Sequence, residues 1–219
     1  RRGLRRLKTD EDWLVASSPP TVSYVEERCW QYAPGAPLCG VEIGNGLVTR
    51  RFVTAPAFGT VDFIINSTAR FGGSQSMFRS VTPEGTVVLD GVTYTIGGLE
   101  QTRTFLAYAN RSEFGLQPSS PRGRALWGAK ANFGYMNHSI GSPTGTAAGL
   151  QHYPWAPGRR GSPQNLQWPP KGVTLAVDFR PENWTAHRDF VLTMTYEVYD
   201  GLPLVAKSMA VRYWPASPH

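Results

Sequence analysis

The sequence lacks the features that mark common enzyme and membrane classes. It has no run of 18 apolar residues, so no membrane-spanning helix is expected. GxSxG, GxxxxGKS/T, HxH and HExxH arrangements are missing, which leaves no local signal for a serine hydrolase, a phosphate-binding loop or a zinc enzyme. No stretch of a dozen residues keeps an amphipathic helical stripe, and there is no internal repeat. We therefore expect little helix, no metal and no cofactor.

Charge is also scarce, at 17% of residues against 41% hydrophobic residues. That balance permits a hydrophobic core and argues against disorder. The formal net charge is +6, but the only dense basic cluster is the N-terminal RRGLRRLK. We interpret residues 1–20 as a basic, then acidic, arm that is solvated or is a processing remnant. No nucleic-acid-binding motif follows it, so no nucleic-acid partner is expected.

Alternating polar and apolar residues recur in several segments of the rest of the chain. The strongest local signal is TVVLDGVTYTI (86–96), in which Asp90-Gly91 separates two alternating runs and predicts a tight hairpin with positive φ. The prediction is an all-β fold: a mostly antiparallel β-sandwich with long loops, formed by residues 21–219 as one domain. Further strands are expected within 21–28, 41–66, 173–179, 189–201 and 204–214.

Cys29 and Cys39 are the only two cysteines. They enclose a loop with two prolines and a glycine, and in a secreted chain they would most simply form one disulfide, adding roughly 2–3 kcal/mol. The alternatives are two free thiols or half of a metal site. No second cysteine pair is present, and no histidine lies at ligand spacing.

Four N-glycosylation sequons begin at Asn66, Asn110, Asn137 and Asn183. One sequon is weak evidence, whereas four favour a glycoprotein, with two or three expected to carry glycan in a eukaryotic source. Some of them could simply be polar turns. Together with the cysteines they predict a secreted or lumenal chain. A mature chain of that kind would have lost its signal peptide, so none is expected at Arg1.

Residues 152–172, HYPWAPGRRGSPQNLQWPPKG, fit neither a helix nor a strand. Aromatic rings stack on the C–H faces of sugars while polar side chains bond the hydroxyls, and the prolines would hold the rings in place beforehand. Alternatively, the aromatic side chains fold inward and cap the end of the sandwich. The candidate carbohydrate-binding residues are Tyr153, Trp155, Arg159, Arg160 and Trp168.

Sixteen acidic residues allow many carboxylate pairs of the kind that glycosidases use, but the sequence does not give their separation. In TYEVYDG (195–201), alternation places Glu197 on the opposite face of its strand from Tyr196 and Val198. Asp200-Gly201 is interpreted as a turn, with a structural role for Asp200. No catalytic residue is assigned.

Two segments resemble a known family. IGNGLVTRRF (43–52) and TYEVYDGLPLVAKSMAV (195–211) are similar to motifs in the N-terminal sandwich domain of secreted α-galactosidase-like glycoside hydrolases, a domain of the galactose-mutarotase-like supersandwich group. The segment 154–171 resembles the long loop that precedes the second motif. The matching residues are Asn45, Gly46, Leu47, Val48, Arg50 or Arg51, and Phe52, then Tyr196, Glu197, Tyr199, Asp200, Gly201, Pro203, Leu204 and Lys207.

The resemblance implies a sandwich without catalytic acids, because those of the related enzymes lie in a separate (β/α)₈ barrel downstream. It also implies that the sandwich is incomplete, with further strands after 204–214. We therefore expect that sheet edge to bind the downstream part of the same precursor or another protein chain. Lys207 and Arg212 could instead guard an exposed edge. Aldose epimerases of the same fold group use a facing histidine and glutamate, and His138 or His152 with Glu197 would be the corresponding pair.

The sequence leaves three functions open. The favoured one is a non-catalytic β-sandwich domain of a secreted glycosidase-like glycoprotein, which acts as a scaffold and contributes aromatic loop residues to carbohydrate binding. The second is an independent carbohydrate-binding or cell-surface interaction module, and the third, less favoured, is a sugar epimerase or hydrolase. The isolated chain is not expected to be an enzyme, although it could be part of a glycoside hydrolase.

Overall fold

The structure, a computed structural model, describes residues 21–31, 37–55, 57–66, 74–77, 83–98, 132–144, 169–181 and 187–213. These segments contain eleven β-strands and no helix, which confirms the predicted all-β fold. The predicted arm, residues 1–20, lies outside the described residues, so the division into an arm and one domain stays a prediction. The strands are β1 (Tyr24–Trp30), β2 (Leu38–Gly44), β3 (Val48–Val53), β4 (Gly59–Asn66), β5 (Ser74–Ser76), β6 (Gly85–Leu89), β7 (Val92–Ile96), β8 (Asn132–Gly141), β9 (Gly172–Pro181), β10 (Phe190–Tyr199) and β11 (Val205–Tyr213).

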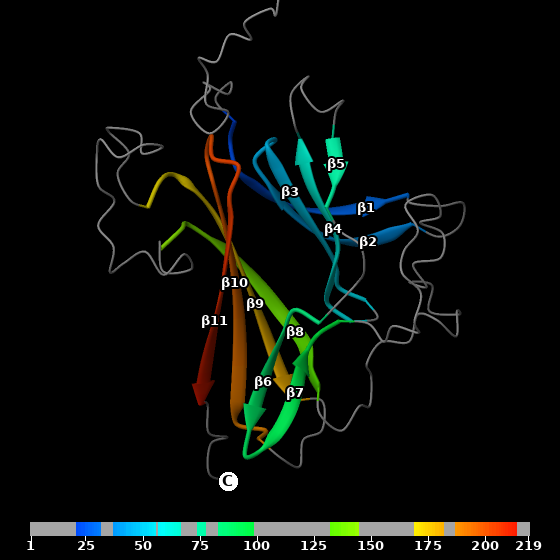
Figure 1. The fold of residues 1–219 in the computed structure, drawn as a ribbon, viewed down its shortest axis with the longest axis vertical. Coiled ribbons are helices and arrows are strands. Elements are labelled where there is room, and N and C mark those ends of the chain that lie inside the picture. Colours follow the sequence, from blue (N-terminus) through cyan, green and yellow to red (C-terminus); the bar gives the residue numbers. More distant parts are fainter. Residues whose placement is uncertain are drawn as a thin grey trace, which may run out of the picture.

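The strands form two sheets that share one core (Figure 1). The five-stranded sheet has the order β1-β2-β3-β4-β5, and the six-stranded sheet has the order β11-β10-β9-β8-β7-β6. Every described pairing is antiparallel except that of β7 with β8, which is parallel. The prediction of a mostly antiparallel sandwich is therefore confirmed. Within these segments no helix is long and apolar enough to cross a membrane.

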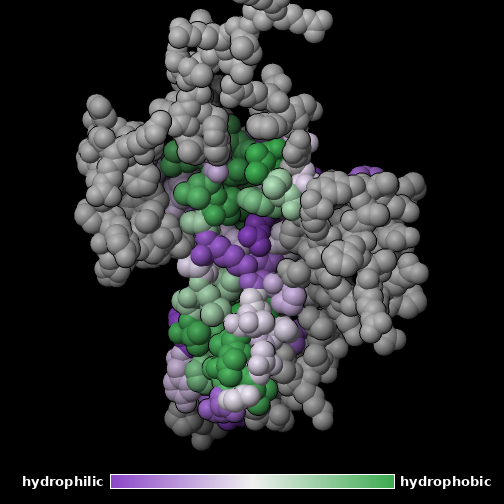
Figure 2. All heavy atoms as spheres, in the orientation of Figure 1, coloured by the Kyte–Doolittle hydropathy of each residue, from purple (hydrophilic) through white to green (hydrophobic). Residues whose placement is uncertain are grey.

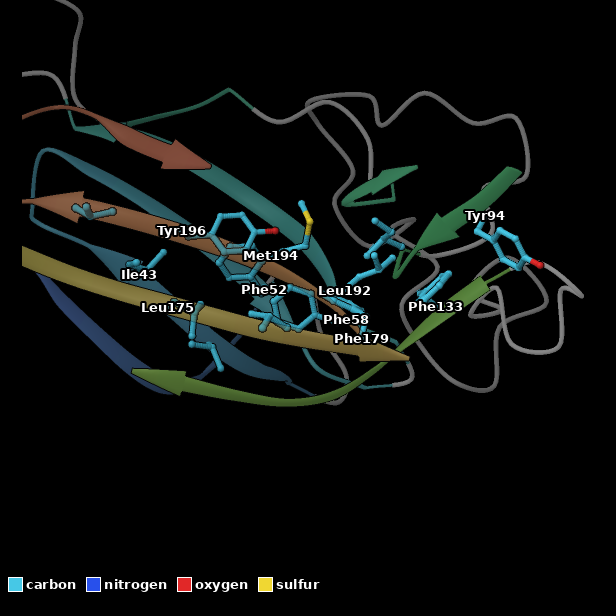
Figure 3. Packing of buried hydrophobic residues seen from close by; sticks show 14 of the residues in the cluster. Ile43, Phe52, Phe58, Tyr94, Phe133, Leu175, Phe179, Leu192, Met194 and Tyr196 are labelled. Atoms are coloured by element: carbon cyan, nitrogen blue, oxygen red, sulfur yellow. The ribbon is translucent and has the colours of Figure 1, made fainter. Parts of the chain in front are cut away.

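Aromatic rings join the two sheets at the centre of the core (Figure 3). The fully buried ring of Phe52, on β3, lies 4.7 Å from that of Tyr196, on β10, measured between ring centroids. Phe58 stacks on Phe52 at 4.9 Å and meets the edge of Phe179, on β9, at 5.5 Å. Each such side chain contributes roughly 1.5–3 kcal/mol by leaving water. This aromatic group fixes how the inner faces of the sheets meet.

Local turn signals were reliable guides to the hairpins. Asp90 and Gly91 adopt φ of 49° and 78° between β6 and β7, as the predicted tight hairpin requires. Gly201 adopts φ of 70° in the turn between β10 and β11. The expected turn at Asp200-Gly201 is thus confirmed.

Two strands were not predicted. β5 occupies residues of a glycine- and serine-rich stretch and pairs with the end of β4, where Ile64 lies opposite Ser76. β8 contains a bulge at Met136, which interrupts the alternation that would identify a strand. Because of this bulge, Tyr135 and His138 both lie on the inner face of the sheet, opposite Phe179 and Val177 respectively.

Candidate functional site

The candidate carbohydrate-binding residues Tyr153, Trp155, Arg159, Arg160 and Trp168 lie outside the described residues, so they stay predictions. The structure does show where that segment rejoins the sheet. The carbonyl of Lys171 accepts a hydrogen bond from the Asp200 backbone N–H at 2.8 Å. The end of the segment therefore lies beside the β10–β11 turn.

The predicted disulfide is confirmed: Cys29 and Cys39 are bonded across the β1–β2 pair. Two of the four sequons can be placed. Asn137 is exposed on β8. At the end of β4, the Asn66 amide donates a hydrogen bond to the Gly46 carbonyl at 2.8 Å. The other two, Asn110 and Asn183, lie outside the described residues, and glycan occupancy of all four stays a prediction.

A buried carboxylate connects the two sheets. Glu84, directly before β6, has a side chain that is only 1% exposed. From the five-stranded sheet, Thr60 donates through its N–H at 2.8 Å and its hydroxyl at 2.6 Å, and Arg50 donates from Nη2 at 2.9 Å. From the six-stranded sheet, the Tyr196 hydroxyl donates at 2.5 Å and Lys207 Nζ at 2.9 Å. We call these five residues the Glu84 junction.

The Glu84 junction stabilises the ionised form of the Glu84 carboxylate. Burial by itself would raise the pKa of Glu84, but attraction to Arg50 and Lys207 and hydrogen bonds from Thr60 and Tyr196 outweigh it, and the pKa lies below its ordinary value. Burial and the neighbouring negative charge hold the pKa of Tyr196 well above its ordinary value, so its hydroxyl stays a donor. Burial lowers the pKa of Lys207. With two cations and one anion, the junction keeps one uncompensated positive charge.

A second junction joins the two motifs through their turns. The Asn45 amide nitrogen donates to the carbonyls of Tyr199 and Leu202 at 2.7 and 2.6 Å, while its oxygen accepts from the Val48 N–H at 3.0 Å. Asp200 accepts from the backbone N–H and the hydroxyl of Ser23 at 2.8 and 2.6 Å. Asp200 thus holds the segment that leads into β1, in agreement with the structural role expected for it.

The two neighbouring arginines of the first motif serve opposite faces of β3. Arg50 reaches the interior, whereas Arg51 Nε donates to Glu42 Oε2 at 2.7 Å on the outer face of the sheet. Glu42 also accepts from the Tyr24 hydroxyl at 2.8 Å and from Trp30 Nε1 at 3.2 Å. Burial opposes ionisation of Glu42, but these donors and the charge of Arg51 bring its pKa below the ordinary value.

The pairing of His138 with Glu197, implied by the epimerase relatives, is wrong for this fold. His138 lies opposite Val177, which lies opposite Met194, and Glu197 is three positions further along β10. An offset of three places the two side chains on opposite faces of the sheet. Glu197 is fully buried and accepts from Thr144 N–H at 2.9 Å and from the Tyr199 hydroxyl at 2.7 Å. His152 lies outside the described residues.

Glu84 and Glu42 were missed by sequence reasoning. Glu84 carries no local signal, because it lies 123 positions from Lys207, 112 from Tyr196 and 34 from Arg50. In the described part of the chain, no group of three or more His, Cys, Asp or Glu side chains is arranged to hold a metal ion.

No protein-family model matches the chain, and neither a curated protein nor a solved structure matches it. The fold and the contacts above therefore define its class by themselves. It is an all-β sandwich whose two sheets are joined by the buried Glu84 junction. A disulfide links the neighbouring strands β1 and β2.

Proposed function

We propose that this chain is a non-catalytic β-sandwich domain of a secreted, glycosidase-like glycoprotein, of the supersandwich type, which acts as a scaffold for a second polypeptide segment. The observation that carries the proposal is that residues of the two motifs hold the two sheets together. Asn45 of the first motif donates to the carbonyl of Tyr199 in the second motif. Arg50 of the first motif binds the Glu84 carboxylate, which Tyr196 and Lys207 of the second motif also bind. Glu84 accepts five hydrogen bonds, which leaves it poorly suited to proton transfer.

The site of association is the edge formed by β11. This strand is terminal in the described six-stranded sheet. Met209, Val211 and Tyr213 lie opposite Met194, Leu192 and Phe190, and so belong to the core face of that sheet, yet they are 42%, 45% and 63% exposed. Figure 2 shows hydrophobic areas on either side of a hydrophilic band on the viewed face. An unpaired edge with apolar residues on one face favours addition of a strand.

The favoured occupant of this edge is the downstream part of the same precursor, and another protein chain is the alternative. Secretion is supported by the disulfide and by the exposed sequon at Asn137. Carbohydrate contact by Tyr153, Trp155, Arg159, Arg160 and Trp168 belongs to the same proposal. The independent carbohydrate-binding or cell-surface module remains the second candidate, because strand addition at β11 would suit a surface interaction equally well.

Photo-crosslinking tests the scaffold role. The chain has four methionines, and three of them, Met77, Met136 and Met209, are more than 40% exposed. Photo-methionine incorporated in cells that naturally produce the protein should therefore crosslink mainly from position 209, to a segment of the same precursor or to one other chain. Met77 and Met136 serve as internal controls of similar exposure. Equal yields from all three positions would contradict association at β11.

A turnover assay tests the non-catalytic part of the proposal. The purified chain should not hydrolyse aryl α-galactosides or interconvert sugar anomers above the rate in buffer. Turnover by the isolated chain that is lost on Glu197→Gln would overturn the scaffold proposal in favour of an enzyme.

A further inference from the structure

An open cleft with a volume of about 450 Å³ lies between the sheets, beside β1, β2 and β8. This is within the range of roughly 300–1,000 Å³ that is usual for small-molecule sites. Its lining comes from the inner faces of β1 and β2 and from β8. It includes Glu27, Val41, Tyr135, His138 and the Cys29–Cys39 disulfide.

The bulge in β8 builds the polar wall of this cleft. In a regular strand, residues three positions apart point to opposite faces; the bulge at Met136 shifts the alternation by one residue, so Tyr135 and His138 both face inward. The Tyr135 hydroxyl and His138 Nδ1 are 2.9 Å apart. The Tyr135 ring is held from behind by Phe58, with ring centroids 5.4 Å apart. The histidine is therefore oriented by its own strand before any ligand arrives.

The proton positions in this pair follow from the two neighbours of the histidine, the Tyr135 hydroxyl and the Glu27 carboxylate. Burial, with a smaller contribution from Glu27, raises the pKa of Tyr135, so its hydroxyl stays protonated. A carboxylate facing Nε2 favours the tautomer with a proton on that nitrogen, and Nδ1 then accepts from the Tyr135 hydroxyl. Nε2 faces the carboxylate of Glu27, with 4.0 Å between Nε2 and Oε1.

That separation is too long for a direct hydrogen bond but suits one bridging atom. Among the described residues, Glu27 has no other polar partner, and its side chain is 82% exposed. A bridging group must accept from Nε2–H and donate to the carboxylate. A hydroxyl can do both, whereas an ammonium only donates, an ionised carboxylate only accepts, and the charge of Glu27 repels a phosphate. Arg28, which also lines the cleft, is already ion-paired with Glu26.

We propose that this cleft binds a neutral, hydroxyl-bearing ring, such as one or two sugar residues, with one ligand hydroxyl bridging Glu27 and His138. The apolar part of the lining, Val41 and the disulfide, suits the C–H face of such a ring, and the Tyr135 ring adds aromatic surface. The described lining residues come neither from residues 152–172 nor from β11. The ligand class of the cleft agrees with the proposed glycosidase-like function, but the two can fail independently.

Titration of the purified chain with glucose, galactose, mannose, lactose and maltose, followed by calorimetry and saturation-transfer NMR, tests the proposal. We expect at least one of these sugars to bind with a Kd in the millimolar range or tighter. Glu27→Gln and His138→Phe should each weaken that binding at least about tenfold, since each removes one of the two partners of the bridging hydroxyl. Tyr135→Phe keeps the ring but removes the hydroxyl that bonds His138 Nδ1. It should weaken binding, because the His138 ring is then no longer held with Nε2 toward Glu27.

Asp90→Asn is the matched control, because it removes the same charge from an exposed carboxylate that also faces a histidine, His187 at 3.7 Å, but lies outside the cleft. It should leave sugar affinity unchanged, and the melting temperature of Glu27→Gln should match that of the wild type because Glu27 is exposed. Absence of binding by every sugar, or unchanged binding by both Glu27→Gln and His138→Phe, would overturn the proposal. Binding of methylammonium or inorganic phosphate in place of sugars would do so too. If Trp155→Ala abolishes sugar binding and Glu27→Gln does not, the sugar is recognised by residues 152–172, and the proposal that the cleft binds it is refuted.

Discussion

Glutamine in place of Glu84 would remove one charge from the interior while keeping the size of the side chain. Arg50 and Lys207 would then remain at the junction with no anion between them, at 18% and 30% side-chain exposure. Removal of one partner of a buried ion pair costs about 3–5 kcal/mol, and the partial exposure of both cations favours the lower part of that range. We expect a loss of about 3–4 kcal/mol in the free energy of unfolding. For a domain of this size that corresponds to a melting temperature lower by roughly 6–16 °C.

Asp178→Asn provides the control for this substitution. Asp178 also accepts from a threonine and an arginine, Thr193 at 2.6 Å and Arg212 at 3.0 Å, but it lies on the outer face with 30% exposure. Its loss should cost less than about 1 kcal/mol. Urea unfolding followed by tryptophan fluorescence measures both variants. An unfolding free energy of Glu84→Gln within 1 kcal/mol of wild type, or equal to that of Asp178→Asn, would refute the view that the junction holds the sheets together.

The same reasoning gives a pH dependence. Because the pKa of Glu84 is lower in the folded protein than its ordinary value of 4.5, its charge stabilises the fold above that pH. This contribution is lost as the pH falls through the depressed folded pKa. The stability difference between wild type and Glu84→Gln should therefore be largest near neutral pH and shrink below pH 4.5. The double variant Glu84→Gln with Lys207→Met should recover part of the loss, because it removes an unpaired cation from the junction.

Three further predictions concern other contacts. Asn45→Ala leaves the carbonyls of Tyr199 and Leu202 without their donor and should cost about 2–3 kcal/mol, measured by urea unfolding. Cys29→Ser should cost roughly 2–3 kcal/mol, and an equal melting temperature for the variant and the wild type would show that the disulfide is dispensable. Trp155→Ala and Trp168→Ala should each weaken glycan binding by about 1–3 kcal/mol with little change in melting temperature. A lowered melting temperature without any glycan binding would instead assign these rings to the core.

The sequence predicted the parts of the fold that depend on neighbours along the chain. The hairpin at Asp90-Gly91 and the strands β9, β10 and β11 follow from turn chemistry and alternation. β8 was missed because its bulge breaks the alternation. Its parallel pairing with β7 also joins segments separated by more than thirty residues, for which no local pattern exists. Tertiary contacts decide such elements.

The candidate site was harder to predict for the same physical reason. The partners of Glu84 come from four different strands, and neither its own position before β6 nor its neighbours in sequence distinguish it from other acidic residues. The cleft is equally hidden, because Glu27 and His138 meet only when both sheets are in place and the bulge has turned the histidine inward. Spacing along the chain reports neither event.

Residues of both motifs make contacts that hold the two sheets together. Asn45 bonds the turn that contains Asp200, and Arg50 shares a carboxylate with Tyr196 and Lys207. These contacts join the two sheets whether or not the chain acts on a sugar. The resemblance therefore bears on how the sandwich is held together. Evidence about a ligand has to come from surfaces that packing leaves free, and the cleft at Glu27 and His138 is one of them.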